Sequence, residues 1–113
     1  MYQGTTPALT FQIAGFDATG MTPFVSFKRG AEILTKTGND IIIAFDKVKN
    51  ASVIVVQMTQ EETLSMRQGT AKVQMRFIDE NGNAYATTKA DLSVEDVIYK
   101  EVIKYDEDGG DEE

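Results

Sequence analysis

The stretch Ala71-Lys72-Val73-Gln74-Met75-Arg76-Phe77 alternates apolar and polar side chains without interruption. In an extended chain successive side chains point to opposite faces, so the apolar residues share one face and the polar residues share the other. The pattern therefore predicts a β-strand with one buried face. Asp79-Glu80-Asn81-Gly82-Asn83 follows, and Asn-Gly is typical of a type I′ hairpin turn because both central residues need a positive φ. We expect residues 84–87 to pair back on this strand.

Similar short apolar segments recur along the chain, separated by turns that contain Gly or Asn. Further strands are expected at residues 9–13, 25–27, 31–35, 41–45, 52–58 and 90–94. Eight closely spaced strands predict an all-β fold, an antiparallel Ig-like β-sandwich of about seven or eight strands. Residues 41–45 are apolar on both faces, so we expect a central strand there. Residues 95–103 fit a strand only in part, and we assign them as the last strand.

One segment departs from the strand pattern. Thr59-Gln60-Glu61-Glu62 has the form of a capping box, in which the Thr59 hydroxyl and the Glu62 carboxylate each accept a hydrogen bond from the other's backbone amide. A short helix from Gln60 to about Arg67 is expected, with Leu64 as its core contact and Gly69 at its end. Its place between two strands predicts a crossover from one sheet to the other.

The charge of the chain is unevenly distributed. The net charge is −7, but residues 106–113 hold six of the 18 acidic residues and no basic one. We expect a single domain over residues 1–105, beginning with an extended arm at residues 1–7, and a disordered acidic tail at 106–113. The low isoelectric point does not favour nucleic acid as a partner. No apolar run is long enough to span a bilayer, and the N-terminus has no features of a secretion signal, so no membrane partner is expected.

The side chains that usually carry chemistry are scarce. The chain contains no Cys, no His and no Trp, so we expect no catalytic residues, no cofactor and no metal, and thus no enzyme. Asp79, Asn81 and Asn83 match the start of a calcium loop, but the required Gly and Glu are missing, and a hairpin turn explains them better. Adjacent acids such as Glu61 and Glu62 point in different directions on a helix and suit its first turn.

Five residues are the candidates for an interface. Leu9, Phe11 and Ile13 belong to a strand without charged residues, which we expect at a sheet edge where it can pair with a neighbouring subunit. Tyr85 and Tyr99 could anchor a protein interface or stack on a carbohydrate, although one aromatic residue per strand is also ordinary sheet packing.

The pattern resembles a family of small β-sandwich modules of phages and prophages, and is similar to the N-terminal domain of phage baseplate upper proteins. The resemblance rests on residues 3–7 before the first strand, on Thr59-Gln60-Glu61-Glu62-Thr63-Leu64, and on residues 73–77 followed by Asp79-Glu80-Asn81-Gly82. It implies a non-enzymatic structural or adaptor protein of a tail or baseplate. Its expected partners are other tail proteins or copies of itself, in the virion and, during assembly, in the bacterial cytoplasm. The alternative is a free-standing Ig-like adhesion or carbohydrate-binding module.

Overall fold

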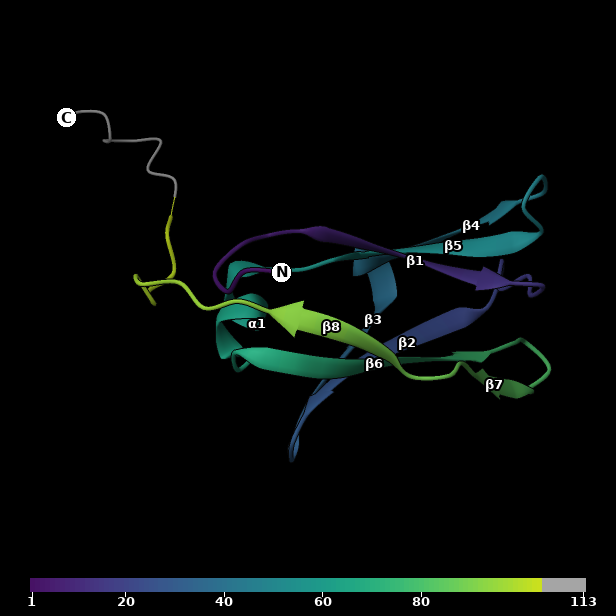
Figure 1. Cartoon of the computed structure of the whole chain (residues 1–113). Helices are drawn as coiled ribbons and strands as arrows, with labels where there is room; N and C mark the ends of the chain where they lie inside the picture. Colours follow the sequence, from purple (N-terminus) through teal and green to yellow (C-terminus); the bar gives the residue numbers. More distant parts are fainter. Residues whose placement is uncertain (105–113) are drawn as a thin grey trace.

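Two antiparallel sheets lie face to face and enclose the apolar core (Figure 1). The computed structural model describes residues 1–104 of the chain. One sheet has the order β1-β5-β4 and consists of β1 (Ala8–Ala14), β5 (Ala51–Gln57) and β4 (Ile41–Asp46). The other sheet has the order β3-β2-β6, and both β7 and β8 pair with the edge of β6 that faces away from β2. Its strands are β3 (Glu32–Thr37), β2 (Thr22–Arg29), β6 (Gly69–Ile78), β7 (Ala84–Ala86) and β8 (Ala90–Val94). The predicted all-β sandwich is confirmed.

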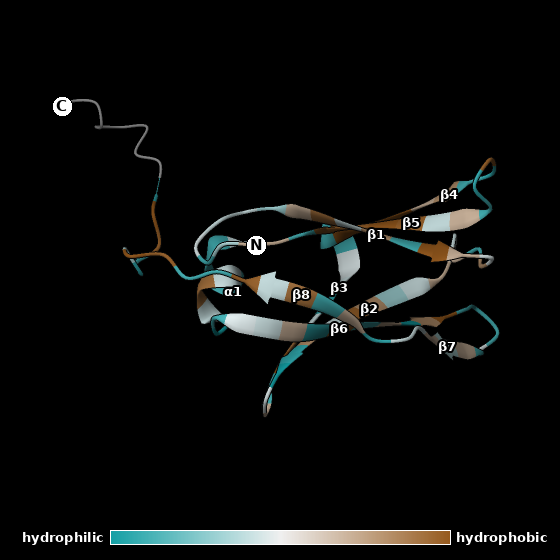
Figure 2. Cartoon of the chain, viewed as in Figure 1, coloured by the Kyte–Doolittle hydropathy of each residue, from teal (hydrophilic) through white to brown (hydrophobic). Residues whose placement is uncertain are grey.

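Strand β6 organises the second sheet as its alternation predicts. Ala71, Val73, Met75 and Phe77 are buried, whereas Lys72 and Arg76 are exposed. Strand β6 has partners on both edges: β2 pairs along one edge, and on the other edge β8 pairs with the first half of β6 and β7 with its end. The buried side chains of β6 meet Ile54 and Val56 of β5 in one core cluster, and hydropathy colouring shows the apolar residues on the two sheets (Figure 2).

The prediction that residues 41–45 form a central strand is wrong. Strand β4 lies at the edge of its sheet, and β5 occupies the centre. Ile41 is buried, but the side chain of Ile42 is 63% exposed. A continuous apolar run does not distinguish a strand covered on both faces from an edge strand whose outer face also carries apolar residues.

Helix α1 (Gln60–Ser65) connects β5 to β6 and so crosses from one sheet to the other, as predicted. Both hydrogen bonds of the capping box are present between Thr59 and Glu62. Two details of the prediction are wrong. The buried residue of the helix is Thr63, with Leu64 only half-buried. The helix ends at Ser65 with Met66 as its C-cap, and Gly69 instead begins β6 with a φ of +123°.

The hairpin between β6 and β7 forms where expected, but with another turn. Ile78 pairs with Ala84, and the amide of Gly82 donates to the carbonyl of Asp79 at 3.1 Å. Gly82 has a φ of +86°, whereas Asn81 is not among the residues with positive φ, so the turn is not type I′. A left-handed Gly after a tight turn is instead typical of three-residue hairpin loops.

Residues 95–104 do not form the predicted last strand. Only Glu95 makes a β-bridge, a parallel one with Tyr2, and residues 96–104 run irregularly away from the end of β8 (Figure 1). The N-terminal arm is bound beside Glu95. The amide of Gln3 donates to the carbonyl of Glu95, and the amide of Glu95 donates to the carbonyl of Met1. The predicted acidic tail at 106–113 lies outside the described residues.

Candidate docking site

Strand β1 lies at an edge of its sheet, as the sequence predicts. It pairs with β5 on one side, from Ala8 opposite Gln57 to Ala14 opposite Ala51, and no strand in residues 1–104 pairs on the other. No charged residue, Pro or bulge interrupts it. These are the devices with which proteins usually protect a strand edge from pairing with another chain. The β1 edge is therefore open to an added strand.

The predicted interface residues Leu9, Phe11 and Ile13 point between the sheets and not outward. All three are half-buried and pack against the core, while Thr10 and Gln12 face solvent. On the opposite sheet, β7 and β8 are short and separated by residues 87–89. A groove of about 420 Å³ opens beside β1 at this interruption, and Phe11 and Ile13 line it together with Val73 and Met75 of β6. We call this the β1 groove.

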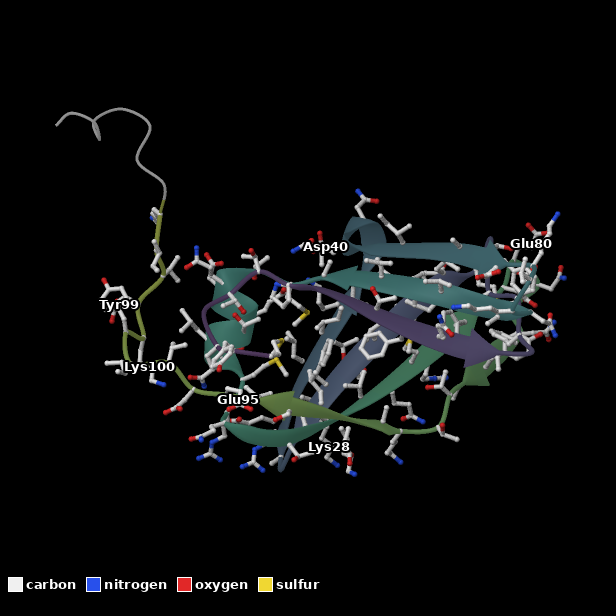
Figure 3. All side chains as sticks on the ribbon, turned by 45° about the horizontal axis from the view of Figure 1, so that its top comes forward. Lys28, Asp40, Glu80, Glu95, Tyr99 and Lys100 are labelled. Atoms are coloured by element: carbon white, nitrogen blue, oxygen red, sulfur yellow. The ribbon has the colours of Figure 1, made fainter. Side chains whose placement is uncertain are left out.

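The two tyrosines that the sequence singled out lie in different places. Tyr85 on β7 is 40% exposed, and its ring lies 5.3 Å from that of Phe16, which in turn packs 5.8 Å from Phe77. Tyr99 lies in the irregular segment beyond β8, 64% exposed, far from β7 (Figure 3). The structure therefore brings Leu9, Phe11 and Ile13 together on β1 but does not bring Tyr99 to the same surface.

Lys36 is a polar residue that sequence reasoning missed. Its side chain is 3% exposed, and the amine donates to Glu62 Oε1 at 2.6 Å, to Asp40 Oδ2 at 3.2 Å and to the carbonyl of Gln57. Glu62 Oε1 also accepts from the Thr59 amide, so the capping box and the buried amine share one carboxylate. An inward-pointing charge on an edge strand opposes pairing at that edge, so β3 is protected where β1 is not. The strand alternation around Lys36 gave no sign of this, since Glu62, the acidic partner at the shorter distance, lies 26 positions away.

Two aspartates, the exposed Asp17 and the half-buried Asp79, stabilise turns. The amide of Asn83 donates to Asp79 Oδ1 at 2.9 Å and lowers the pKa of Asp79 below its ordinary value. The hydroxyl and the amide of Thr19 donate to Asp17 Oδ1 and lower the pKa of Asp17 likewise. Asp79 thus serves the hairpin that the sequence favoured over a calcium loop. Within residues 1–104 no group of three potential ligands from His, Cys, Asp and Glu gathers as a metal site.

No protein-family model and no curated protein matches the chain. In the described part of the chain, no helix has the length and apolarity needed to cross a membrane.

Proposed function

We propose that this chain is a non-enzymatic structural or adaptor protein of a phage or prophage tail or baseplate, which acts by pairing β1 with a neighbouring protein. The open β1 edge carries the proposal. An added strand there gains main-chain hydrogen bonds along β1, and its inward side chains enter the β1 groove and cover Phe11, Ile13, Val73 and Met75. The edge thus offers both affinity and side-chain specificity.

The assignment to a phage particle rests on the sequence resemblance to baseplate modules. In the structure, the segments that carry this resemblance are the residues before β1, the capped crossover helix α1, and β6 with its hairpin. Two of these elements lie next to the proposed contact: the residues before β1 lead into the open edge, and β6 supplies the floor of the β1 groove. The expected location is the virion, and the expected partners are other tail proteins or further copies of this chain.

The test blocks the edge without touching the core. In Thr10→Lys/Gln12→Lys, two exposed positions of β1 acquire the charges that natural edge strands carry. We expect the variant to fold normally and to lose capture of tail proteins from disrupted virions, and any self-association through β1 should fall as well. The control is Thr70→Lys, which adds a charge at an exposed position of β6 that is already paired with Ser93 of β8.

Capture that is equal for the native chain and the β1 variant would reject the β1 edge as the contact. A native chain that captures no tail protein and does not self-associate would reject the assembly function itself. A glycan-binding screen then tests the alternative, a carbohydrate-binding module. Tyr85 is its aromatic candidate, although that ring already packs against Phe16.

A further inference from the structure

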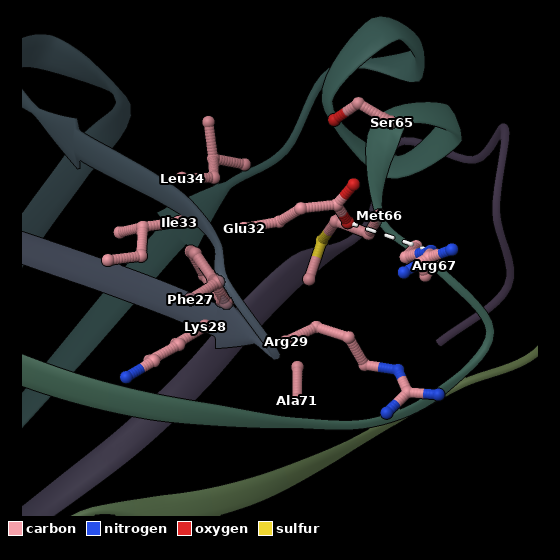
Figure 4. Close-up of a pocket in the computed structure, with 10 residues that line it drawn as sticks. All are labelled: Phe27, Lys28, Arg29, Glu32, Ile33, Leu34, Ser65, Met66, Arg67 and Ala71. Atoms are coloured by element: carbon pink, nitrogen blue, oxygen red, sulfur yellow. Dashed lines mark ion pairs between the residues drawn. The ribbon is translucent and has the colours of Figure 1, made fainter.

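A second groove lies at the other side of the sandwich, between the β2–β3 hairpin and the end of α1 (Figure 4). It measures about 260 Å³, and we call it the hairpin groove. Its floor is apolar, from Phe27, Leu34 and Met66. Its rim is mainly basic, from Lys28, Arg29 and Arg67. Such a site suits a peptide that combines apolar side chains with carboxylates.

The rim charges are available to a ligand. Arg67 is 70% exposed in its side chain, and its ion pair with Glu32, the one acidic rim residue, is long at 3.9 Å. Arg29 Nε donates to the carbonyl of Gln68 at 3.0 Å, which fixes the guanidinium at the mouth of the groove and leaves its other nitrogens for a carboxylate. Lys28 is exposed and makes no ion pair among the described residues.

The chain itself contains a segment of complementary chemistry. In residues 97–104, Ile98 is fully exposed, and Tyr99 and Ile103 are 64% and 63% exposed. Six acidic residues follow within positions 106–113. Along the chain, exposed apolar side chains therefore come first and acidic side chains follow. Apolar side chains suit the floor of the hairpin groove, and acidic side chains suit its basic rim.

Within residues 1–104 these apolar side chains are left largely exposed. Lys100 Nζ donates to Gln3 Oε1, and Gln60 exchanges two hydrogen bonds with the backbone of Ile103. These bonds fix the segment at the beginning of α1, with Tyr99 directed away from the sandwich (Figure 3), whereas the hairpin groove lies at the end of that helix. In this arrangement an apolar groove on a second molecule would bury Ile98, Tyr99 and Ile103.

We propose that the hairpin groove of one copy binds residues 97–113 of a second copy. Apolar side chains of residues 97–104 cover the floor, and the acids that follow meet Lys28, Arg29 and Arg67. The two contacting surfaces differ, so the contact closes a dimer if two copies exchange segments reciprocally, and it generates rings or filaments if it repeats head-to-tail. The inference rests on the proposed assembly function, but it uses another surface than the β1 edge.

A charge swap tests the contact. Light scattering during size exclusion, at several protein concentrations and at low salt, measures self-association. We expect the native chain to self-associate, as dimers or larger oligomers, and Lys28→Glu/Arg67→Glu to weaken association by about tenfold or more, because two attractions become repulsions. Replacing Asp106, Glu107 and Asp108 with Lys should weaken it similarly, and combining both sets should restore it. The control Lys47→Glu/Lys49→Glu makes the same charge change in the turn between β4 and β5 and should leave association unchanged.

A synthetic peptide of residues 96–113 separates the possible occupants. We expect it to bind the native chain, more weakly at high salt, and to bind Lys28→Glu/Arg67→Glu at least about tenfold more weakly. A native chain that stays monomeric, with peptide binding only after truncation at Tyr105, would show that each chain binds its own acidic residues and would overturn the proposal. Self-association that ignores the charge swap but is lost in Thr10→Lys/Gln12→Lys would also overturn it while supporting the β1 contact.

Discussion

The amine of Lys36 lies 2.6 Å from Oε1 of Glu62, and this ion pair joins the second sheet to the crossover helix. Lys36 belongs to β3, whereas Glu62 closes the capping box of α1, and the same amine also donates to the carbonyl of Gln57 on the first sheet. A buried charge is tolerated when it is both paired and hydrogen-bonded, and these contacts supply both. The two sheets and the crossover therefore meet at a single amine.

Replacing Lys36 with Met tests this joint. The substitution keeps much of the aliphatic length but removes the amine, so the Gln57 carbonyl and the Glu62 carboxylate lose a donor. We expect the free energy of unfolding to fall by about 2–4 kcal/mol in urea denaturation, somewhat below the range for a fully buried pair because Glu62 retains 23% exposure. The exposed Lys49→Met is the control and should change stability by less than about 0.5 kcal/mol.

The Phe77→Ala variant tests the register of β6. Phe77 is 1% exposed and packs against Phe16, so truncation leaves a cavity between the sheets. We expect a loss of about 3–5 kcal/mol in the free energy of unfolding. Arg76→Ala, one position away on the exposed face, should cost less than about 1 kcal/mol. Equal effects of the two substitutions would contradict the assigned register.

The alternation of residues 71–77 was sufficient to predict β6, because one face of that strand meets the core and the other meets solvent. The capping box was equally informative, because its hydrogen bonds are local. The order of strands was not predictable in this way. Whether residues 41–45 form a central or an edge strand depends on which strands pair beside them. Apolar residues such as Ile42 and Ala44 are compatible with either position, so the sequence does not distinguish the two.

The candidate site was predicted only in part. The lack of charge in residues 9–13 indicated an edge strand, and the structure places β1 at an edge. The β1 groove was not predictable, because its floor comes from Val73 and Met75 and depends on the break between β7 and β8. The expected strand at 95–103 was wrong for a related reason: the spacing of apolar residues does not show whether a partner strand lies beside them, and here only Glu95 pairs, with Tyr2.

Asp79 predicts a specific dependence of stability on pH. The Asn83 amide that donates to its carboxylate lowers the pKa in the folded state, so the folded chain binds this proton less readily than the unfolded chain. The stabilisation is therefore complete above the ordinary value of 3.8 and is lost as the pH falls through the lowered pKa. We expect native and Asp79→Asn proteins to differ in melting temperature near neutral pH and to converge in strong acid. Glu80→Gln is the control, since its carboxylate makes no hydrogen bond or ion pair within residues 1–104, and it should show no such convergence.

Gly69→Ala tests the backbone at the start of β6, beside the hairpin groove. Gly69 has a φ of +123°, which side chains with a Cβ rarely adopt, and an added Cβ would lie 2.5 Å from a guanidinium nitrogen of Arg29. We expect a loss of about 1–3 kcal/mol in the free energy of unfolding. Gly20→Ala, at a φ of +80° with no atom within 4 Å of the added Cβ, carries backbone strain alone and should cost about 1 kcal/mol. In the double variant Gly69→Ala/Arg29→Ala the clash is gone, so its loss should be smaller than the sum of the two single losses. Strict additivity would show that Arg29 does not restrict this glycine, and that its guanidinium moves freely at the groove mouth.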